Sequence, residues 1–266
     1  MEYRELGRTG EKVPTIGMGT WGMGSYSSSD ERAHQVQALR RGIELGMTLI
    51  DTAEMYASGR SEEVVGEAVR GNRSGVFIAT KVSPEHLLRA DVMKACEASL
   101  RRLGTSCIDL YQVHWPNRAI PIKETMAAME DLVSQGKIRY IGVSNFSPAE
   151  TTEARDALTK NEIVSNQIVY SLANHTIEAE VLPYCVREKL TLIAYSPLNQ
   201  GKIDTQALPK ALLLKYGITP AQMILNWVTR NKQVVAIPKT TNLAHLEENA
   251  SSVAVRFDES EYQQIA

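Results

Sequence analysis

At 266 residues the chain is longer than most single domains but fits one large one. Its 29 lysine and arginine residues nearly balance 31 aspartate and glutamate residues, and the net charge of -2 excludes the basic excess of a nucleic-acid-binding protein. With 43% hydrophobic and 23% charged residues the chain can bury a sizeable core, so a disordered protein is excluded as well.

Short apolar runs that predict strands alternate with helix-period segments along the whole chain. The run 13–18 predicts the first strand, and a helix follows over 29–46 with a capping box at Ser28 and Glu31. Seven further strands are predicted at 48–51, 76–81, 107–113, 138–143, 163–168, 190–195 and 234–237. The helices between and after them are predicted from Ser61, over 90–102, over 122–135, from Ser147, over 177–188, from Thr219, from Asn242 and, as a short terminal helix, near 257–261.

Short apolar strands that are each followed by a helix are typical of a parallel sheet covered by helices. Eight such units in about 250 residues suit an α/β fold of the (β/α)8 TIM barrel type. A doubly wound sheet has the same alternation, so periodicity alone leaves the closure of the sheet open. No linker-like or low-complexity segment divides the chain, and we predict a single domain over residues 1–266.

Glycines near the N-terminus imitate a dinucleotide-binding fingerprint. Residues 17–22, GMGTWG, fit the pattern GxGxxG. That fingerprint needs its third glycine to open a helix whose N-terminus faces a pyrophosphate. Here the next helix is predicted only from residue 29, so we interpret the segment as a loop that carries Thr20 and Trp21.

The start of the chain and its cysteines bear on the cellular compartment. The first residues, MEYRE, lack the apolar core of a signal peptide, and no apolar run approaches the length of a membrane-spanning helix. Cys96, Cys107 and Cys185 are odd in number and far apart, which argues against a disulfide framework or a cysteine zinc site. We expect a cytoplasmic protein, with no membrane partner and no nucleic-acid partner.

Polar residues that are costly inside apolar strands cluster where the predicted strands end. They are Asp51, Lys81, His114, Ser144, Asn145, Gln167, Tyr195 and Lys239. In a barrel these strand ends face one mouth, where active sites of this fold are built. Each residue alone has an ordinary structural explanation, such as a hydrogen-bonded core histidine or a solvated lysine. Their coincidence on seven strands indicates a functional site.

Three of these residues, together with Tyr56, indicate a chemistry. A lysine in a water-poor site needs a counter-charge to keep its proton, and Asp51 is placed to supply one to Lys81. A phenol has an ordinary pKa of roughly 10, and we expect the Lys81 ammonium to lower the pKa of Tyr56 toward the range useful for acid catalysis. His114 can then orient a carbonyl oxygen. Carbonyl reduction needs such a proton donor, and it takes a hydride from a cofactor.

Six motifs resemble, in the right order, those of the aldo-keto reductases: DTAEMY at 51–56, ATK at 79–81, QVHWP at 112–116, GVSN at 142–145, AYSPL at 194–198 and IPKTT at 237–241. The resemblance extends over nearly the whole chain. It implies an eight-stranded barrel that binds NADPH without a Rossmann fold, and a catalytic tetrad of Asp51, Tyr56, Lys81 and His114. The implied activity is NADPH-dependent reduction of aldehydes and ketones to alcohols, with Tyr56 as the proton donor.

The resemblance also implies which residues contact the cofactor. Ser144, Asn145 and Gln167 match residues that hydrogen-bond the nicotinamide carboxamide, and Tyr195 matches the aromatic residue on which the ring stacks. Ser196 and Leu198 match a loop along the pyrophosphate, Lys239 and Thr240 match the pair that contacts the 2′-phosphate, and Glu248 and Asn249 match positions near the adenine. Further cofactor contacts are implied for Thr20, Trp21 and His245.

His245 departs from the family pattern. Many members have an arginine six residues after the strand-end lysine, and that arginine holds the 2′-phosphate of NADPH. A histidine is only partly charged near neutral pH and cannot make a bidentate contact. We therefore expect that NADPH is still preferred, through Lys239 and Thr240, with weaker use of NADH.

The substrate side and the alternatives are less specific. Trp21, Tyr56, His114 and Trp115 are expected to wall an apolar mouth for small-molecule carbonyl substrates, although Trp115 fits simple packing equally well. The oligomeric state is expected to be a monomer or a weak homo-oligomer.

Two alternative functions stay open. Some relatives of this family are cofactor-binding regulatory subunits of potassium channels, so slow turnover in a regulatory role is one alternative. A metal-dependent barrel hydrolase is another, but it needs more strand-end ligands than Asp51 and His114, and we predict no metal site.

Overall fold

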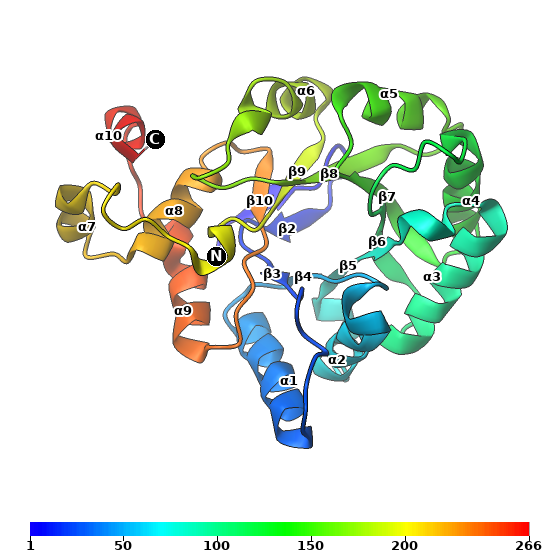
Figure 1. Ribbon diagram of the computed structural model, residues 1–266, viewed down its shortest axis with the longest axis horizontal. Coiled ribbons are helices and arrows are strands. Elements are labelled where there is room, and N and C mark those ends of the chain that lie inside the picture. The colour runs from blue at the N-terminus through cyan, green and yellow to red at the C-terminus, as the bar shows by residue number, and fades with distance from the viewer. Residues whose placement is uncertain (266) are drawn as a thin grey trace.

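The computed structural model describes residues 1–265, and residue 266, the last of the predicted single domain, lies outside the described residues. Eight strands form one parallel sheet in chain order: β3 (Met18–Gly19), β4 (Leu49–Asp51), β5 (Phe77–Val82), β6 (Ile108–Val113), β7 (Ile138–Ser144), β8 (Ile163–Val169), β9 (Thr191–Tyr195) and β10 (Val234–Ala236). Figure 1 shows these strands at the centre of the molecule, with helices around them.

The first and last strands of this sheet meet and close it into a barrel. The backbone amide of Gly17 donates to the carbonyl of Ala236 at 2.8 Å, and that of Gly19 donates to the carbonyl of Pro238 at 3.1 Å. Ile16 also forms a parallel bridge with Ala236. The predicted (β/α)8 barrel is therefore confirmed, and the doubly wound alternative is excluded.

Ten α-helices connect or follow the strands: α1 (Ser29–Glu44), α2 (Arg60–Ala68), α3 (Arg89–Leu103), α4 (Ile122–Ser134), α5 (Pro148–Asp156), α6 (Val181–Glu188), α7 (Lys210–Tyr216), α8 (Pro220–Val228), α9 (Leu243–Ser251) and α10 (Glu259–Ile265), counted over residues 1–265. Complete capping boxes open α5 and α8, at Ser147 and Thr219. The box predicted at Ser28 is only half formed. Its hydroxyl accepts from the amide of Glu31, but the Glu31 carboxylate accepts from the amide of Ser27 instead.

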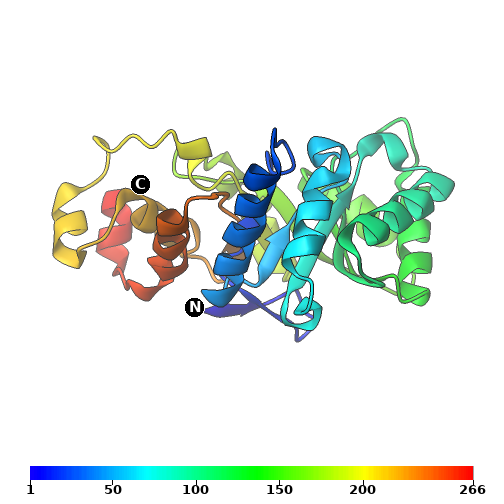
Figure 2. The same ribbon diagram turned by 90° about the horizontal axis from the view of Figure 1, so that it is seen from below.

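The sequence prediction was wrong about the first strand. The run 13–18 is divided, because Pro14 ends β2 (Lys12–Pro14) and the barrel strand β3 contains only Met18 and Gly19. Proline cannot donate to a strand ladder and glycine packs poorly in one, so Pro14 and Gly17 break the run. Strand β2 pairs instead with β1 (Tyr3–Glu5) in an antiparallel hairpin, which lies beneath the barrel in Figure 2.

Two helical segments also differ from the prediction. The helix expected over 177–188 is a 3-10 turn, η4 (Thr176–Glu178), followed by α6, and the sequence pattern missed α7. Helix α7 lies beside α10 in Figures 1 and 2, where Lys215 and Tyr216 bind the carboxylate of Glu261. Among residues 1–265, no helix combines the length and the apolar character that crossing a membrane requires.

Alternation of side chains along the strands produces two hydrophobic cores. On β5, for example, Phe77 and Ala79 face the barrel interior, whereas Ile78 faces the helices. The interior core consists of Leu6, Val13, Leu49, Phe77, Ala79, Leu110, Val164, Ile193, Val235 and Ile237. Leu6 and Val13 come from the N-terminal hairpin, which therefore closes the barrel at the amino ends of its strands.

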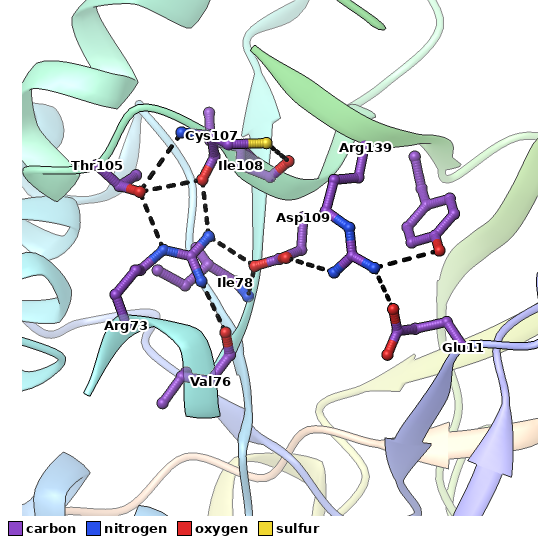
Figure 3. Close-up of polar contacts among 10 residues, drawn as sticks. Glu11, Arg73, Val76, Ile78, Thr105, Cys107, Ile108, Asp109 and Arg139 are labelled. Atoms are coloured by element: carbon purple, nitrogen blue, oxygen red, sulfur yellow. Dashed lines mark hydrogen bonds and ion pairs between the residues drawn. The ribbon is translucent and has the colours of Figure 1, made fainter. Parts of the chain in front are cut away.

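A network around Asp109 joins the amino ends of three strands (Figure 3). The carboxylate, with 8% of the side chain exposed, accepts from Arg73 at 2.6 Å and from Arg139 at 2.8 Å. It also accepts from the backbone amide of Ile78 at 2.9 Å. Arg139 further binds Glu11, in the turn of the hairpin. This network stabilises the end of the barrel away from the strand ends that carry the predicted site.

Candidate active site

Four predicted site residues come from neighbouring elements at the carboxyl ends of the strands. Asp51 ends β4, Lys81 is the fifth residue of β5 and His114 follows β6; their exposed fractions are 2%, 0% and 3%. Tyr56 begins η1 (Tyr56–Gly59), a 3-10 turn between β4 and α2, and is half-buried. Because parallel strands present their carboxyl ends at one edge, these side chains lie at one end of the barrel.

The ammonium group of Lys81 has three hydrogens and three acceptors. Its Nζ lies 2.7 Å from Oδ2 of Asp51, 2.8 Å from the carbonyl oxygen of Thr52 and 3.3 Å from the hydroxyl oxygen of Tyr56. Burial by itself lowers the pKa of Lys81, but Asp51 and then Tyr56 raise the pKa above its ordinary value. Lys81 is therefore charged, and Asp51 is its counter-ion, as the sequence predicted.

The pKa of Tyr56 does not follow the sequence-based expectation. Burial is the largest cause, and together with Asp51 it raises the pKa of Tyr56 by more than the nearby Lys81 ammonium lowers it. The expected net decrease is therefore wrong, because the sequence shows the neighbouring charge but not the depth of burial. The phenol stays protonated at neutral pH, and the Lys81 ammonium keeps the pKa of Tyr56 lower than burial alone would set it.

His114 is a neutral imidazole in this site. Its ring stacks on that of Trp115, with 4.2 Å between centroids, and meets the ring of Tyr56 edge-on at 5.6 Å. Burial, and then the Lys81 ammonium, lower the pKa of His114 to about 2. Within residues 1–265 its buried Nδ1 has no hydrogen-bond partner. A buried N–H without an acceptor is costly, so we assign the single ring proton to Nε2.

Four residues predicted to hold a nicotinamide ring form a continuous polar belt next to His114. The side-chain amide of Asn145 donates to the carbonyl oxygen of His114 and to Oγ of Ser144, both at 3.0 Å. Its Oδ1 accepts from the Tyr195 hydroxyl at 3.1 Å, and the Ser144 hydroxyl donates to the carbonyl oxygen of Gln167 at 2.9 Å. Asn145 has a left-handed backbone, with φ of 63°.

Gln167 has a contact that the sequence did not predict. Its Nε2 donates to Oδ1 of Asp51 at 2.7 Å, so Gln167 and Lys81 each bind one oxygen of the same carboxylate. The side-chain oxygen of Gln167 is then its remaining acceptor. Together with Oδ1 of Asn145 it suits the NH2 group of a nicotinamide carboxamide, so these two acceptor oxygens fit the predicted cofactor.

The residues predicted to bind the adenosine half of the cofactor lie apart from this belt. Lys239 and Thr240 are on the connection between β10 and α9, whereas His245, Glu248 and Asn249 are on α9. Lys239 and His245 are exposed, Thr240 and Glu248 are half-buried and Asn249 is buried. No hydrogen bond or ion pair between the described side chains joins these five residues to the tetrad.

The end of β3 contacts both the segment after β10, which leads to Lys239, and the end of β4, which carries Asp51. A Cβ atom at Gly19 would lie 2.7 Å from the carbonyl oxygen of Ile237, so only glycine lets the two segments pack this closely. Next to it, the buried Thr20 hydroxyl donates to the carbonyl oxygen of Asp51 at 2.9 Å. On the loop after β9, the strand that pairs with β10, Ser196 has φ of 50° and Leu198 is half-buried.

The mouth beside the tetrad is bordered by large exposed apolar side chains. Trp21 is 64% exposed and Trp115 40% exposed, which fits their predicted contact with substrate. Met55, which directly precedes Tyr56, is also 46% exposed, and the sequence analysis did not single it out. Within residues 1–265, no cluster of three or more histidine, cysteine, aspartate or glutamate residues is arranged to hold a metal ion.

Comparison with known proteins gives a consistent set of relatives. The profile of the Aldo/keto reductase family matches residues 15–266. Methylglyoxal reductase YeaE of Escherichia coli is 44% identical over 254 residues, which cover 94% of this chain and 88% of that protein. An aldo-keto reductase from Klebsiella pneumoniae, crystallised with NADPH, superposes with a TM-score of 0.92 at 41% identity, covering 99% and 93% of the two chains. The thermostable aldo-keto reductase Tm1743, crystallised with the inhibitor epalrestat, superposes with a TM-score of 0.94 at 39% identity, covering 99% and 98%.

Proposed function

The chain belongs to the aldo/keto reductase family, and from this premise we propose that it reduces aldehydes and ketones to alcohols with NADPH, with Tyr56 as the proton donor. The observation that carries the proposal is the 3.3 Å contact between the Tyr56 hydroxyl and the Lys81 ammonium. This contact places a protonated phenol beside a fixed positive charge, at the end of the barrel where substrates bind in this fold.

The polar belt supports NADPH as the cofactor. The Klebsiella relative was crystallised with NADPH, and here Asn145 and Gln167 offer acceptor oxygens to the NH2 group of its carboxamide. Tyr195, half-buried beside them, offers an aromatic face for the ring. When bound, the dihydronicotinamide supplies the hydride that reduces the carbonyl carbon.

Residues of the chain protonate and orient the carbonyl oxygen of the substrate. As that oxygen becomes negative, the Tyr56 hydroxyl transfers its proton to it, and the phenolate left behind is stabilised by the Lys81 ammonium. Nε2–H of the neutral His114 donates a hydrogen bond to the same oxygen and sets its orientation. Asp51 and the carbonyl oxygen of Thr52 hold Lys81 in place throughout.

The rate of reduction is expected to be independent of the protonation of His114. Because the pKa of His114 is lowered to about 2, lowering the pH through 6.5 leaves the imidazole neutral. The pKa of Tyr56 is raised above 10, so the acid form persists until strongly alkaline pH. We expect kcat/KM for 4-nitrobenzaldehyde to stay level between about pH 5 and 9. A step near pH 6.5 that disappears in His114→Gln would contradict this assignment.

Arginine in place of His245 is expected to strengthen the preference for NADPH. An exposed arginine is fully charged and can bind the 2′-phosphate with two hydrogen bonds, which predicts a rise in kcat/KM for NADPH of about tenfold. The value for NADH is expected to change little, because its 2′-hydroxyl is neutral. Gln135→Arg, which adds a charge at an exposed site at the end of α4, on the opposite side of the barrel from α9, is the control and is expected to leave the cofactor ratio unchanged.

A carbonyl panel with both cofactors tests the proposed function. NADPH oxidation is followed with 4-nitrobenzaldehyde, methylglyoxal and simple ketones. Turnover of several members is expected because Trp21 and Trp115 expose apolar surface. Methylglyoxal is included because the 44% identical relative is a methylglyoxal reductase. Binding of NADPH without turnover of any member would overturn the proposal and favour a cofactor-binding regulatory protein.

A further inference from the structure

The backbone immediately after Tyr56 is strained. Ala57, Ser58 and Gly59 have φ values of 49°, 55° and 88°, a run of three left-handed residues. For residues other than glycine this conformation is unfavourable and seldom adopted. Such a turn persists only where its surroundings hold it, so the position of the Tyr56 hydroxyl depends on what those surroundings are.

A buried carboxylate lies just beyond this turn. Glu62 is in the first turn of α2, and its side chain has no exposed surface. Its Oε1 accepts from the Thr80 hydroxyl at 2.6 Å, and its Oε2 accepts from Nε of Arg102, near the end of α3, at 2.6 Å. Thr80 directly precedes Lys81 on β5. Glu62 therefore joins the start of α2 to the strand that carries the lysine.

Arg102 in turn covers the last residue of the strained turn. A Cβ atom at Gly59 would lie 2.6 Å from both Cδ and Nε of Arg102. Helices α2 and α3 pack closely here, since a Cβ atom at Gly66 of α2 would lie 2.6 Å from the carbonyl oxygen of Leu103. This close packing brings Arg102 of α3 against Gly59. The guanidinium group is thus fixed between the Glu62 carboxylate and the backbone at Gly59.

Stabilisation of the helix end does not account for Glu62. An acidic residue in the first turn complements the helix dipole from an exposed position, and the half-buried neighbour Glu63 already provides one. Burying a second carboxylate is costly unless it is paired and hydrogen-bonded. The geometry of Glu62, with one oxygen on the lysine strand and one on Arg102, indicates a positioning role.

We propose that Glu62 and Arg102 form a latch that holds the left-handed turn 57–59 and thereby keeps the Tyr56 hydroxyl on Nζ of Lys81. Both are positioning residues, and the inference rests on the proposed function for its kinetic readouts. Ser61 binds the Thr20 hydroxyl at 2.8 Å and is bound by Thr52 at 3.1 Å, so the far side of the turn has a separate anchor. Loss of the latch is therefore expected to displace Tyr56 without unfolding the loop.

The test compares Glu62→Gln and Arg102→Met with the parent protein. We expect kcat for 4-nitrobenzaldehyde to fall about 10- to 100-fold, because small misplacements of a reacting group cost this much. The Kd for NADPH is expected to stay within about twofold, since the cofactor residues lie on other loops. In alcohol oxidation the phenolate acts as the base, and the rising limb of the pH profile is expected to move to higher pH as Tyr56 leaves Lys81. Arg102→Lys keeps the charge without the flat group over Gly59 and is expected to recover only part of kcat.

Two matched variants separate positioning from general stability. Asp109→Asn weakens a comparably buried, doubly paired carboxylate at the opposite end of the barrel, and Glu63→Gln removes the neighbouring charge of the same helix turn. Both are expected to keep the parent kcat and pH profile, even where Asp109→Asn lowers the unfolding midpoint. If Glu62→Gln lowers stability as Asp109→Asn does but leaves kcat and the pH profile unchanged, the latch is refuted.

Hydrogen exchange gives a readout that does not require activity. Amides of residues 55–61 are expected to exchange faster in Glu62→Gln than in the parent. In Asp109→Asn their exchange rates are expected to equal those of the parent. If the parent reduces no carbonyl compound but this difference is present, the proposed function fails and the latch stands. Equal exchange in all three proteins would overturn the latch, whatever the parent catalyses.

Discussion

Tyr56→Phe is expected to lower kcat for carbonyl reduction by about 10²- to 10⁴-fold, the usual contribution of a positioned general acid. The variant removes the hydroxyl that contacts the Lys81 ammonium and leaves the ring and the loop in place. The residual rate reflects hydride transfer assisted only by His114 and solvent. The Kd for NADPH is expected to be unchanged, because the residues proposed to bind the cofactor are intact.

A matched substitution controls for the loss of any tyrosine hydroxyl. Tyr184 on α6 shares a 2.9 Å hydrogen bond with Thr152, outside the tetrad. Tyr184→Phe is expected to keep the parent kcat. Rates of Tyr56→Phe within about threefold of the parent would show that the proton comes from another group, and the proposed mechanism would then fail.

Lys81→Met is expected to damage both activity and stability. It leaves the Asp51 carboxylate buried with Gln167 as its only remaining side-chain donor among the described residues. Removing one partner of a buried ion pair costs about 3–5 kcal/mol, so the urea midpoint is expected to fall markedly. The loss in kcat is expected to match or exceed that of Tyr56→Phe, because the phenolate formed in reduction loses its neighbouring positive charge.

A double variant separates the two effects of this substitution. Asp51→Asn combined with Lys81→Met removes the unpaired charge as well, and the unfolding free energy is expected to recover by more than half. Activity is expected to stay low, because Tyr56 still lacks the ammonium. If the single variant Lys81→Met were as stable as the parent, the pairing of Asp51 with Lys81 would contribute nothing to folding. Recovery of kcat in the double variant would contradict the role assigned to Lys81.

Local sequence patterns determined most of the barrel. Seven of the eight barrel strands follow from apolar runs, and the helices at Ser147 and Thr219 follow from their capping boxes. The strand that failed, 13–18, is the one in which Pro14 and Gly17 interrupt the run. Whether β3 meets β10 depends on hydrogen bonds between residues more than 200 positions apart, as from Gly17 to Ala236, and no local pattern contains that information.

The candidate site divides in the same way. Asp51, Lys81 and His114 were found because a polar residue at the end of an apolar strand is costly, and this cost is visible in the sequence. The direction of the Tyr56 pKa, the bond from Gln167 to Asp51 and the burial of Glu62 were not visible. The sequence shows which chemical groups the chain carries, and the spacing of its apolar residues predicts the local strands and helices. Burial and long-range pairing set the energies of those groups, and only the closed barrel determines them.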